Sequence, residues 1–144
     1  MSTRERDPQR VYLDTSAYLR LLLDEEGSQR VAEQTDGAEL LSSVLLMLEA
    51  RRNLIRLTRE GTLTPEKYQA CMARVETDTG RFVFRDLTLD LCESNTVPAV
   101  ATPRSLDLVH LRTALWFHAA KRLDRFVTMD ASQETAAREL GLPV

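Results

Sequence analysis

Residues 11–23 read VYLDTSAYLRLLL, in which a short apolar strand is followed at once by an apolar helix. Asp14 stands at the junction of the two elements. A carboxylate flanked this closely by apolar residues has few routes to solvent, and burying it unpaired is costly. Two interpretations are therefore open. Asp14 either caps the N-terminus of the helix, as Asp, Thr and Ser commonly do, or belongs to a functional site.

The rest of the chain repeats this alternation of strand and helix. We expect strands at 11–13, 39–43, 81–86, 125–129 and 142–144, helices at 16–34 (weakly interrupted at Gly27), 44–60, 64–78, 88–94, 105–122 and 132–140, and a loop at 95–104. Strands separated by helices form right-handed βαβ units, and hence a parallel sheet covered on both faces. The predicted fold class is α/β, a three-layer α/β/α sandwich with a short parallel sheet of four to five strands.

The composition agrees with one globular domain. The chain has 144 residues, of which 43% are hydrophobic and 28% charged. We expect a flexible lead-in at 1–10 and a single domain over 11–144. No apolar run is long enough to cross a bilayer and no signal peptide is recognisable, so we expect a cytoplasmic protein without a membrane partner. Cys71 and Cys92 lack the spacing of a zinc site and are expected to be reduced thiols.

Four acidic residues occupy positions that indicate a shared site. Asp14 and Asp130 each follow a strand, and functional groups of open parallel sheets collect at the carboxyl ends of the strands. Glu49 lies in a helix that follows directly on the second strand, and Asp107 lies in the first turn of a helix that is apolar nearly all round. Structural alternatives remain open here. Asp130 could cap a helix, and the helix dipole could stabilise Asp107 by about 0.3–1 kcal/mol.

Four carboxylates in one crevice would repel each other, and without a counter-ion some of them would take up protons. A divalent cation removes this difficulty. Ligation by carboxylate and water oxygen alone favours Mg²⁺ or Mn²⁺ over zinc, and no His or Cys ligand set competes. The four acids therefore predict a magnesium or manganese site.

Four motifs, in this order, match a known family. They are LDTSA from Leu13, SSVLLMLEA around Glu49, SLDLVHLRTAL around Asp107 and FVTMDASQETAARELGLPV at the end of the chain. On these motifs the chain resembles the PIN-domain nucleases, and among them the VapC-type toxins of type II toxin–antitoxin pairs. The resemblance extends over 11–144, although 81–104 contains no diagnostic residues.

The resemblance implies the strand order 3-2-1-4-5 and a metal-dependent endoribonuclease. It also implies that Asp14, Glu49, Asp107 and Asp130 build the site, with Mg²⁺ or Mn²⁺ held most directly by Asp14 and Asp107. Glu49 and Asp130 are expected to bind through water, to hold a second metal or to orient the nucleophile. Candidates for supporting hydrogen bonds are Thr15, Ser16 and Thr128. Attack by a metal-activated water is expected to leave a 5′-phosphate and a 3′-hydroxyl.

The two histidines could instead indicate acid–base catalysis of the ribonuclease type. His110 follows Asp107 by one helical turn, and His118 lies two turns further along. A histidine on a buried helix is more often a hydrogen-bonded core residue, which is the expectation here. Trp116 and Phe117 are expected in the core for the same reason.

The net charge of -3 does not argue against an RNA partner, because the chain without the four site acids carries +1. Arg52 and Arg56 recur with Glu49 at helical spacing and are candidates for contacts to RNA phosphates. A solvated helix face with Glu–Arg pairs explains the same pattern equally well.

Partner proteins follow from the resemblance. The leucines of the early helices, which pack in the core by default, also form a dimer interface and a groove for the antitoxin in the family. We therefore expect a homodimer and a cognate antitoxin. Two other classes stay open: a PIN-like module that binds RNA or protein without cleavage, and a receiver-type or phosphoryl-transfer domain. The second class usually needs a lysine near a late strand, and neither Lys67 nor Lys121 is well placed.

Overall fold

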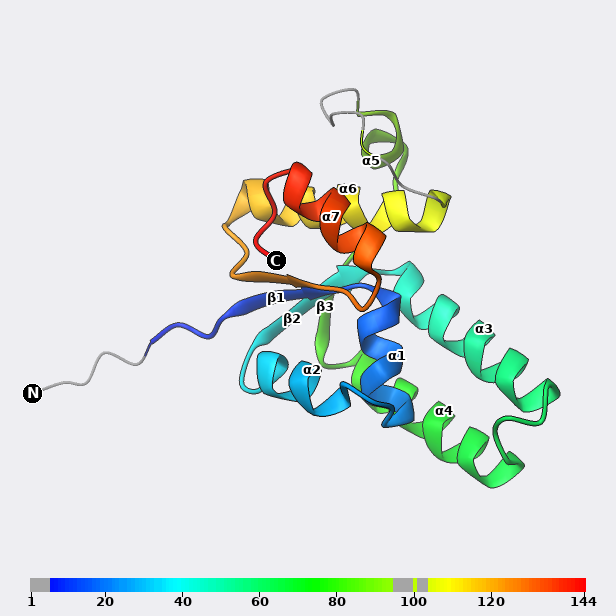
Figure 1. Cartoon of the computed structure of the whole chain (residues 1–144). Helices are drawn as coiled ribbons and strands as arrows, with labels where there is room; N and C mark the ends of the chain where they lie inside the picture. The colour runs from blue at the N-terminus through cyan, green and yellow to red at the C-terminus, as the bar shows by residue number, and fades with distance from the viewer. Residues whose placement is uncertain (1–5, 95–99, 101–103) are drawn as a thin grey trace, which may run out of the picture.

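Four parallel strands run through the centre of the protein (Figure 1). The computed structural model describes residues 6–94, 100 and 104–144. The strands are β1 (Arg10–Leu13), β2 (Glu39–Ser43), β3 (Phe82–Arg85) and β4 (Arg125–Val127), in the order β3-β2-β1-β4. Tyr12 of β1 lies opposite Leu41 of β2 and Phe126 of β4. The two neighbours of β1 are thus elements far apart in the sequence.

Helices cover both faces of this sheet (Figure 1). They are α1 (Thr15–Leu23), α2 (Ser28–Thr35), α3 (Leu45–Arg59), α4 (Pro65–Thr79), α5 (Leu89–Glu93), α6 (Ser105–Ala120) and α7 (Ala131–Glu139). Side chains alternate along β1, since successive residues of a strand point to opposite faces. Tyr12 packs with Leu111 of α6 and other residues of α6 and α7, whereas Leu13 packs with Ala17 and Val31 of α1 and α2. The predicted three-layer α/β/α sandwich is confirmed.

The helices α3 and α4 form a hairpin that extends beyond the sheet on the side of α1 (Figure 1). Leu54 of α3 and Val75 of α4 are fully buried in a cluster that also takes in Leu22 of α1. The early leucines therefore pack in the core, as expected by default. Thr64 caps α4 by accepting a hydrogen bond from the Lys67 N–H at 3.2 Å.

The predicted helix 16–34 is wrong in one respect, because two helices occupy this range. Asp24 ends α1 in the left-handed region, with φ at 52°, and Gly27 precedes α2 with φ at 88°. Two positive φ angles within four residues interrupt the helical hydrogen bonds, and such angles favour glycine. Gly27 therefore marks the boundary of two helices and not a weak interruption of one.

The fifth strand predicted at 142–144 is also wrong, and the order 3-2-1-4-5 is reduced to four strands among the residues described. Gly141 turns the chain after α7 with φ at 80°, and Pro143 accepts one hydrogen bond from the Phe126 N–H at 2.6 Å. A proline has no N–H and cannot continue a ladder. The C-terminal residues thus contact the outer edge of β4 without extending the sheet.

Other boundaries differ by only a few residues. Arg10 is buried and belongs to β1, so the lead-in reaches Gln9 at most; 6–9 is exposed and has no helix or strand. β4 ends at Val127 and not at Met129. Most of the predicted loop 95–104 lies outside the described residues. In the part of the chain described, no helix combines the length and apolar character needed to cross a membrane.

One residue of α6 departs from the predicted core. Phe117 is 5% exposed, but Trp116 is 43% exposed and lies under the Arg85 guanidinium, 4.5 Å from the ring centroid. An apolar helix has one face against the sheet, so the opposite face meets solvent even when its residues are hydrophobic.

Candidate functional site

Asp14 is buried at the carboxyl end of β1, with 4% of its surface exposed. Its Oδ1 accepts hydrogen bonds from the Ala17 N–H at 3.1 Å and from the Ser16 hydroxyl at 2.7 Å, which makes it the N-cap of α1. Burial raises the pKa of Asp14, while His110, Thr128, Ser16 and the Ala17 N–H act to lower it. The capping interpretation is correct in its geometry. It does not account for a carboxylate whose charge is penalised by its surroundings.

Ser16 and Thr128 connect the ends of β1 and β4. The Ser16 Oγ lies 3.2 Å from the Thr128 Oγ1 and accepts a hydrogen bond from the Met129 N–H at 2.9 Å. The Asp14 N–H also donates to the Val127 carbonyl at 3.2 Å. Two of the three predicted supporting residues, Ser16 and Thr128, thus hold Asp14 against the end of the neighbouring strand.

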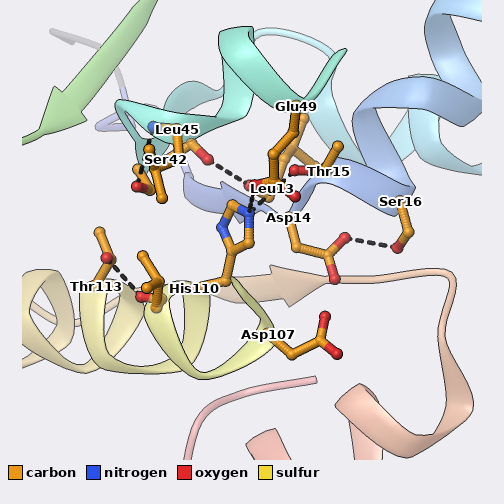
Figure 2. A network of polar contacts seen from close by, with 12 residues as sticks. Leu13, Asp14, Thr15, Ser16, Ser42, Leu45, Glu49, Asp107, His110 and Thr113 are labelled. Carbon is orange, nitrogen blue, oxygen red and sulfur yellow. Dashed lines mark hydrogen bonds and ion pairs between the residues drawn. The ribbon is translucent and has the colours of Figure 1, made fainter. Parts of the chain in front are cut away.

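Asp107 approaches Asp14 from the opposite layer. It lies in the first turn of α6 and is half-buried. Burial is the main cause that raises the pKa of Asp107, followed by repulsion from Asp130 and from Asp14; Arg104 and His110 lower it. Figure 2 shows Asp14 and Asp107 reaching toward the same space from β1 and α6. Asp107 is therefore within electrostatic reach of two other predicted acids, Asp14 and Asp130.

Asp130 is exposed and caps α7. Its Oδ1 accepts hydrogen bonds from the Ser132 N–H at 2.8 Å and the Gln133 N–H at 3.2 Å, and its own N–H donates to the Thr128 Oγ1 at 3.2 Å. The capping role of Asp130 is therefore real. It fixes the backbone at the end of β4 and places the carboxylate on the same edge of the sheet as Asp14.

Glu49 is placed differently from the three aspartates. Its Oε1 lies 3.0 Å from the His110 Nε2, and its side chain is 17% exposed. His110 is 2% exposed, and its Nδ1 lies 2.8 Å from the Tyr12 hydroxyl. The prediction of a buried, hydrogen-bonded His110 is confirmed. Thr15, predicted to support the acids, contacts the His110 Nε2 at 3.1 Å.

Gln133 is a site residue that the sequence did not single out. It is 1% exposed, and its Nε2 donates to the backbone carbonyl of Asp107 at 2.9 Å, so α7 is tied to the first turn of α6. In MDASQE it stands at the position where a capping-box Gln would reach back to its own helix. The sequence therefore marked Gln133 as a polar residue of the helix start, but the packing of α7 against α6 makes the Asp107 carbonyl its hydrogen-bond partner.

The donor set fits a hard divalent cation in its chemistry. Among residues 6–94, 100 and 104–144, no three His, Cys, Asp or Glu side chains are grouped so that they could hold a metal ion. The nearby donors are carboxylate oxygens. The pKa of Asp107 is raised first by burial and then by repulsion from Asp130 and Asp14, and a cation would relieve this repulsion. Mg²⁺ usually keeps several waters and needs only one or two carboxylates from the protein. The aspartates satisfy this requirement.

Arg52 and Arg56 lie on the exposed face of α3, away from the sheet. Arg56 forms an ion pair with Glu60 at 3.2 Å and a hydrogen bond to the Asn53 Oδ1 at 3.2 Å. This is the Glu–Arg pairing expected of a solvated helix face. Exposed pairs of this kind contribute little to stability, so the arginine could exchange Glu60 for a phosphate.

The remaining histidine has a structural role. The His118 Nδ1 accepts a hydrogen bond from the Leu123 N–H at 3.0 Å and so fastens the turn between α6 and β4. No protein-family profile matches the chain, and no curated protein matches it. The chemistry of the site therefore rests on the geometry of its residues.

Proposed function

We propose that this protein is a metal-dependent endoribonuclease of the PIN-domain type, and that it acts as the VapC-like toxin of a type II toxin–antitoxin pair. The observation that carries the proposal is that Asp107 lies within electrostatic reach of both Asp14 and Asp130, although the three residues come from distant segments of the chain. Carboxyl groups with raised pKa values that gather at one edge of a sheet are typical of functional sites. The four sequence motifs supply the choice of RNA as substrate.

The residues that would hold Mg²⁺ or Mn²⁺ most directly are Asp14 and Asp107, with Glu49 and Asp130 acting through water or on a second cation. When bound, the cation would lower the pKa of a water ligand and neutralise charge on the phosphate. Asp14 brings a carboxylate that is already oriented by Ser16 and by the first turn of α1. Asp107 brings one that is partly desolvated, which strengthens its attraction for a cation.

Glu49 and Asp130 complete the set, one from α3 and the other from the end of β4. Glu49 is held by His110 and is suited to orient a water that attacks the phosphate. Asp130 is exposed, so it can meet either the substrate or a second cation through water. In-line attack by water gives a 5′-phosphate and a 3′-hydroxyl, and cyclic phosphate ends would contradict this mechanism.

Partner proteins are part of the proposal. Val44, Leu48 and Ile55 of the α3 segment are 42%, 65% and 47% exposed, at a spacing that brings them near one helix face. A homodimer partner or the cognate antitoxin would cover such a stripe. The proposed place of action is the cytoplasm, where the RNA substrate is found.

The decisive experiment is cleavage of a panel of cellular RNAs by the purified protein with Mg²⁺, with Mn²⁺ and with EDTA. The Asp14→Asn variant keeps an oxygen to cap α1 but lacks the charge. Asp36→Asn makes the same change at an exposed position before β2, at the opposite edge of the sheet, and serves as the control. Discrete cuts that need metal and disappear only in Asp14→Asn support the proposal. RNA binding without any cleavage would replace it by a binding module.

A further inference from the structure

His110 has a partner on each ring nitrogen, and the partners come from three different elements. Its Nδ1 lies 2.8 Å from the Tyr12 hydroxyl of β1, and its Nε2 lies 3.0 Å from Glu49 of α3 and 3.1 Å from Thr15 of α1 (Figure 2 shows the contacts on the Nε2 side). The ring is 2% exposed. The ring therefore links Tyr12 of β1 to Glu49 of α3 and is itself shielded from bulk water.

Chemistry decides which nitrogen carries the proton. An ionised carboxylate can only accept hydrogen bonds, so the Nε2 must donate to Glu49. In the tautomer that carries its proton on Nε2, the Nδ1 is bare, and the Tyr12 phenol is the donor that this nitrogen needs. Thr15 shares the Nε2 proton at slightly greater distance. Each member of the chain from Tyr12 to Glu49 thus has a defined direction of donation.

Glu49 needs such a partner more than the aspartates do. Asp14 and Asp130 have short side chains that are held by the backbone N–H groups of the helices they cap. Glu49 has a longer side chain and lies inside α3, one turn past its start, where no free N–H groups are available. In the described part of the chain, His110 makes the one hydrogen bond that its carboxylate receives.

We propose that His110 is a positioning residue that holds the Glu49 carboxylate at the site, with Tyr12 fixing the orientation of the ring. The inference rests on the proposed nuclease function for its effect on catalysis, but the geometry it assigns stands independently. His110 itself touches neither substrate nor scissile phosphate. Its role is that of the outer partners that orient ligands in metal sites, whose loss typically lowers activity or metal affinity about 10–100-fold.

The first test reads the ring directly, in the absence of metal and RNA. Long-range proton–nitrogen correlation spectra of nitrogen-15-labelled protein distinguish a protonated from a bare ring nitrogen. The chain has two histidines, so the spectrum of His118→Gln assigns the signals. A protonated Nε2 and a bare Nδ1 on His110 are expected. A proton on Nδ1 alone would overturn the inference, because Glu49 would then have no donor.

The second test separates positioning from folding. His110→Gln can place an amide N–H near the position of Nε2, whereas His110→Leu fills the space without a donor. We expect kcat to fall about 10–100-fold in His110→Leu with KM unchanged, and to be largely retained in His110→Gln. Val75→Ala truncates a fully buried residue of α4, in a cluster that contains none of Tyr12, Thr15, Glu49 and His110, and is the control for a loss of stability alone.

The outcomes are distinguishable from failure of the nuclease proposal. Equal kcat in His110→Leu and wild type, or an equal loss in Val75→Ala, would overturn the positioning role while cleavage by the wild type still supports the nuclease. If the wild type cuts no RNA with either metal, the nuclease proposal fails. The spectra then decide the inference by themselves, and a bare Nδ1 supports the assigned geometry.

Discussion

Replacing Asp14 by Asn should stabilise the metal-free protein at neutral pH. Burial raises the pKa of this carboxyl above its value in the unfolded chain, so ionised Asp14 opposes folding. The asparagine Oδ1 can still accept from the Ala17 N–H and the Ser16 hydroxyl, and the cap of α1 is kept. The substitution therefore removes a charge and little else.

The size of the effect is a difference between two contributions. The two hydrogen bonds to Oδ1 weaken by about 1 kcal/mol each when the acceptor loses its charge. The desolvation of the charge outweighs them, since burial is the largest cause acting on this pKa and the net direction is upward. A net gain of about 0.5–2 kcal/mol, of the size found for substitutions that relieve strained functional sites, is expected. For a chain of this length 1 kcal/mol corresponds to about 3 °C in Tm.

The upward shift of the Asp14 pKa also determines how the stability difference between the variant and the wild type depends on pH. A group whose pKa is raised in the folded state contributes stability below its unfolded pKa and loses it as the pH rises through the folded value. The advantage of Asp14→Asn should thus be present at pH 7 and disappear below about pH 3, where Asp14 is protonated in both the folded and the unfolded state. Urea unfolding in EDTA at both pH values measures it.

Bound metal should reverse the order of stability of the wild type and Asp14→Asn. Saturating Mg²⁺ at about 100 times its Kd would stabilise the wild type by about 2.7 kcal/mol through binding to the native state alone. Asp14→Asn should gain much less, and so become the less stable of the two. A variant that is less stable than wild type in EDTA would refute the argument from buried charge. A wild type whose Tm does not respond to Mg²⁺ or Mn²⁺ would refute the metal site.

Three further substitutions address separate parts of the molecule. Tyr18→Phe removes the hydrogen bond of 2.8 Å to the buried Asp78 and should lower the free energy of unfolding by about 1–3 kcal/mol without lowering kcat. Unchanged stability in chemical unfolding would show that the arginines near the Asp78 carboxylate are enough to stabilise it. Gln133→Leu should lower kcat while changing the free energy of unfolding by no more than about 1 kcal/mol. The variant loses one hydrogen bond to the first turn of α6, but it also removes a buried Oε1 that has no partner among the described residues. Full activity would show that this hydrogen bond is dispensable. Replacing Arg52 and Arg56 together by Ala should weaken RNA binding and reduce the slope of log affinity against log salt by about 1.4, and an unchanged slope would assign them to a solvated helix face.

The alternation of short apolar runs with amphipathic segments was enough to predict the fold class. Val11 to Leu13 could be recognised as a buried strand because all members of a central parallel strand are apolar, and the structure has all four residues of β1 buried. The split near Gly27 was missed because a single glycine only weakens a helix, and the positive φ of Asp24, a non-glycine residue, has no signal in the sequence. The missing fifth strand followed from Pro143, whose lack of an N–H was already visible in the sequence.

For the site, sequence position was sufficient where a residue's place depends on the strand it follows. Asp14 and Asp130 lie at the carboxyl edge because parallel strands end on the same side, and this can be read from the chain. Asp107 is near them because a helix starts above that edge, a fact that the order of elements also contains.

Only the tertiary structure decided which side chains touch. The hydrogen bond between Glu49 and His110 joins residues 61 positions apart. The hydrogen bond from Gln133 to the backbone of Asp107 joins residues 26 positions apart on two different helices. Local rules of capping and periodicity act over a few residues, so they predict that Asp130 caps α7 but not where Gln133 points. Contacts between layers depend on how all the side chains of the core pack at once, which is why the positioning of Glu49 became visible only in the folded protein.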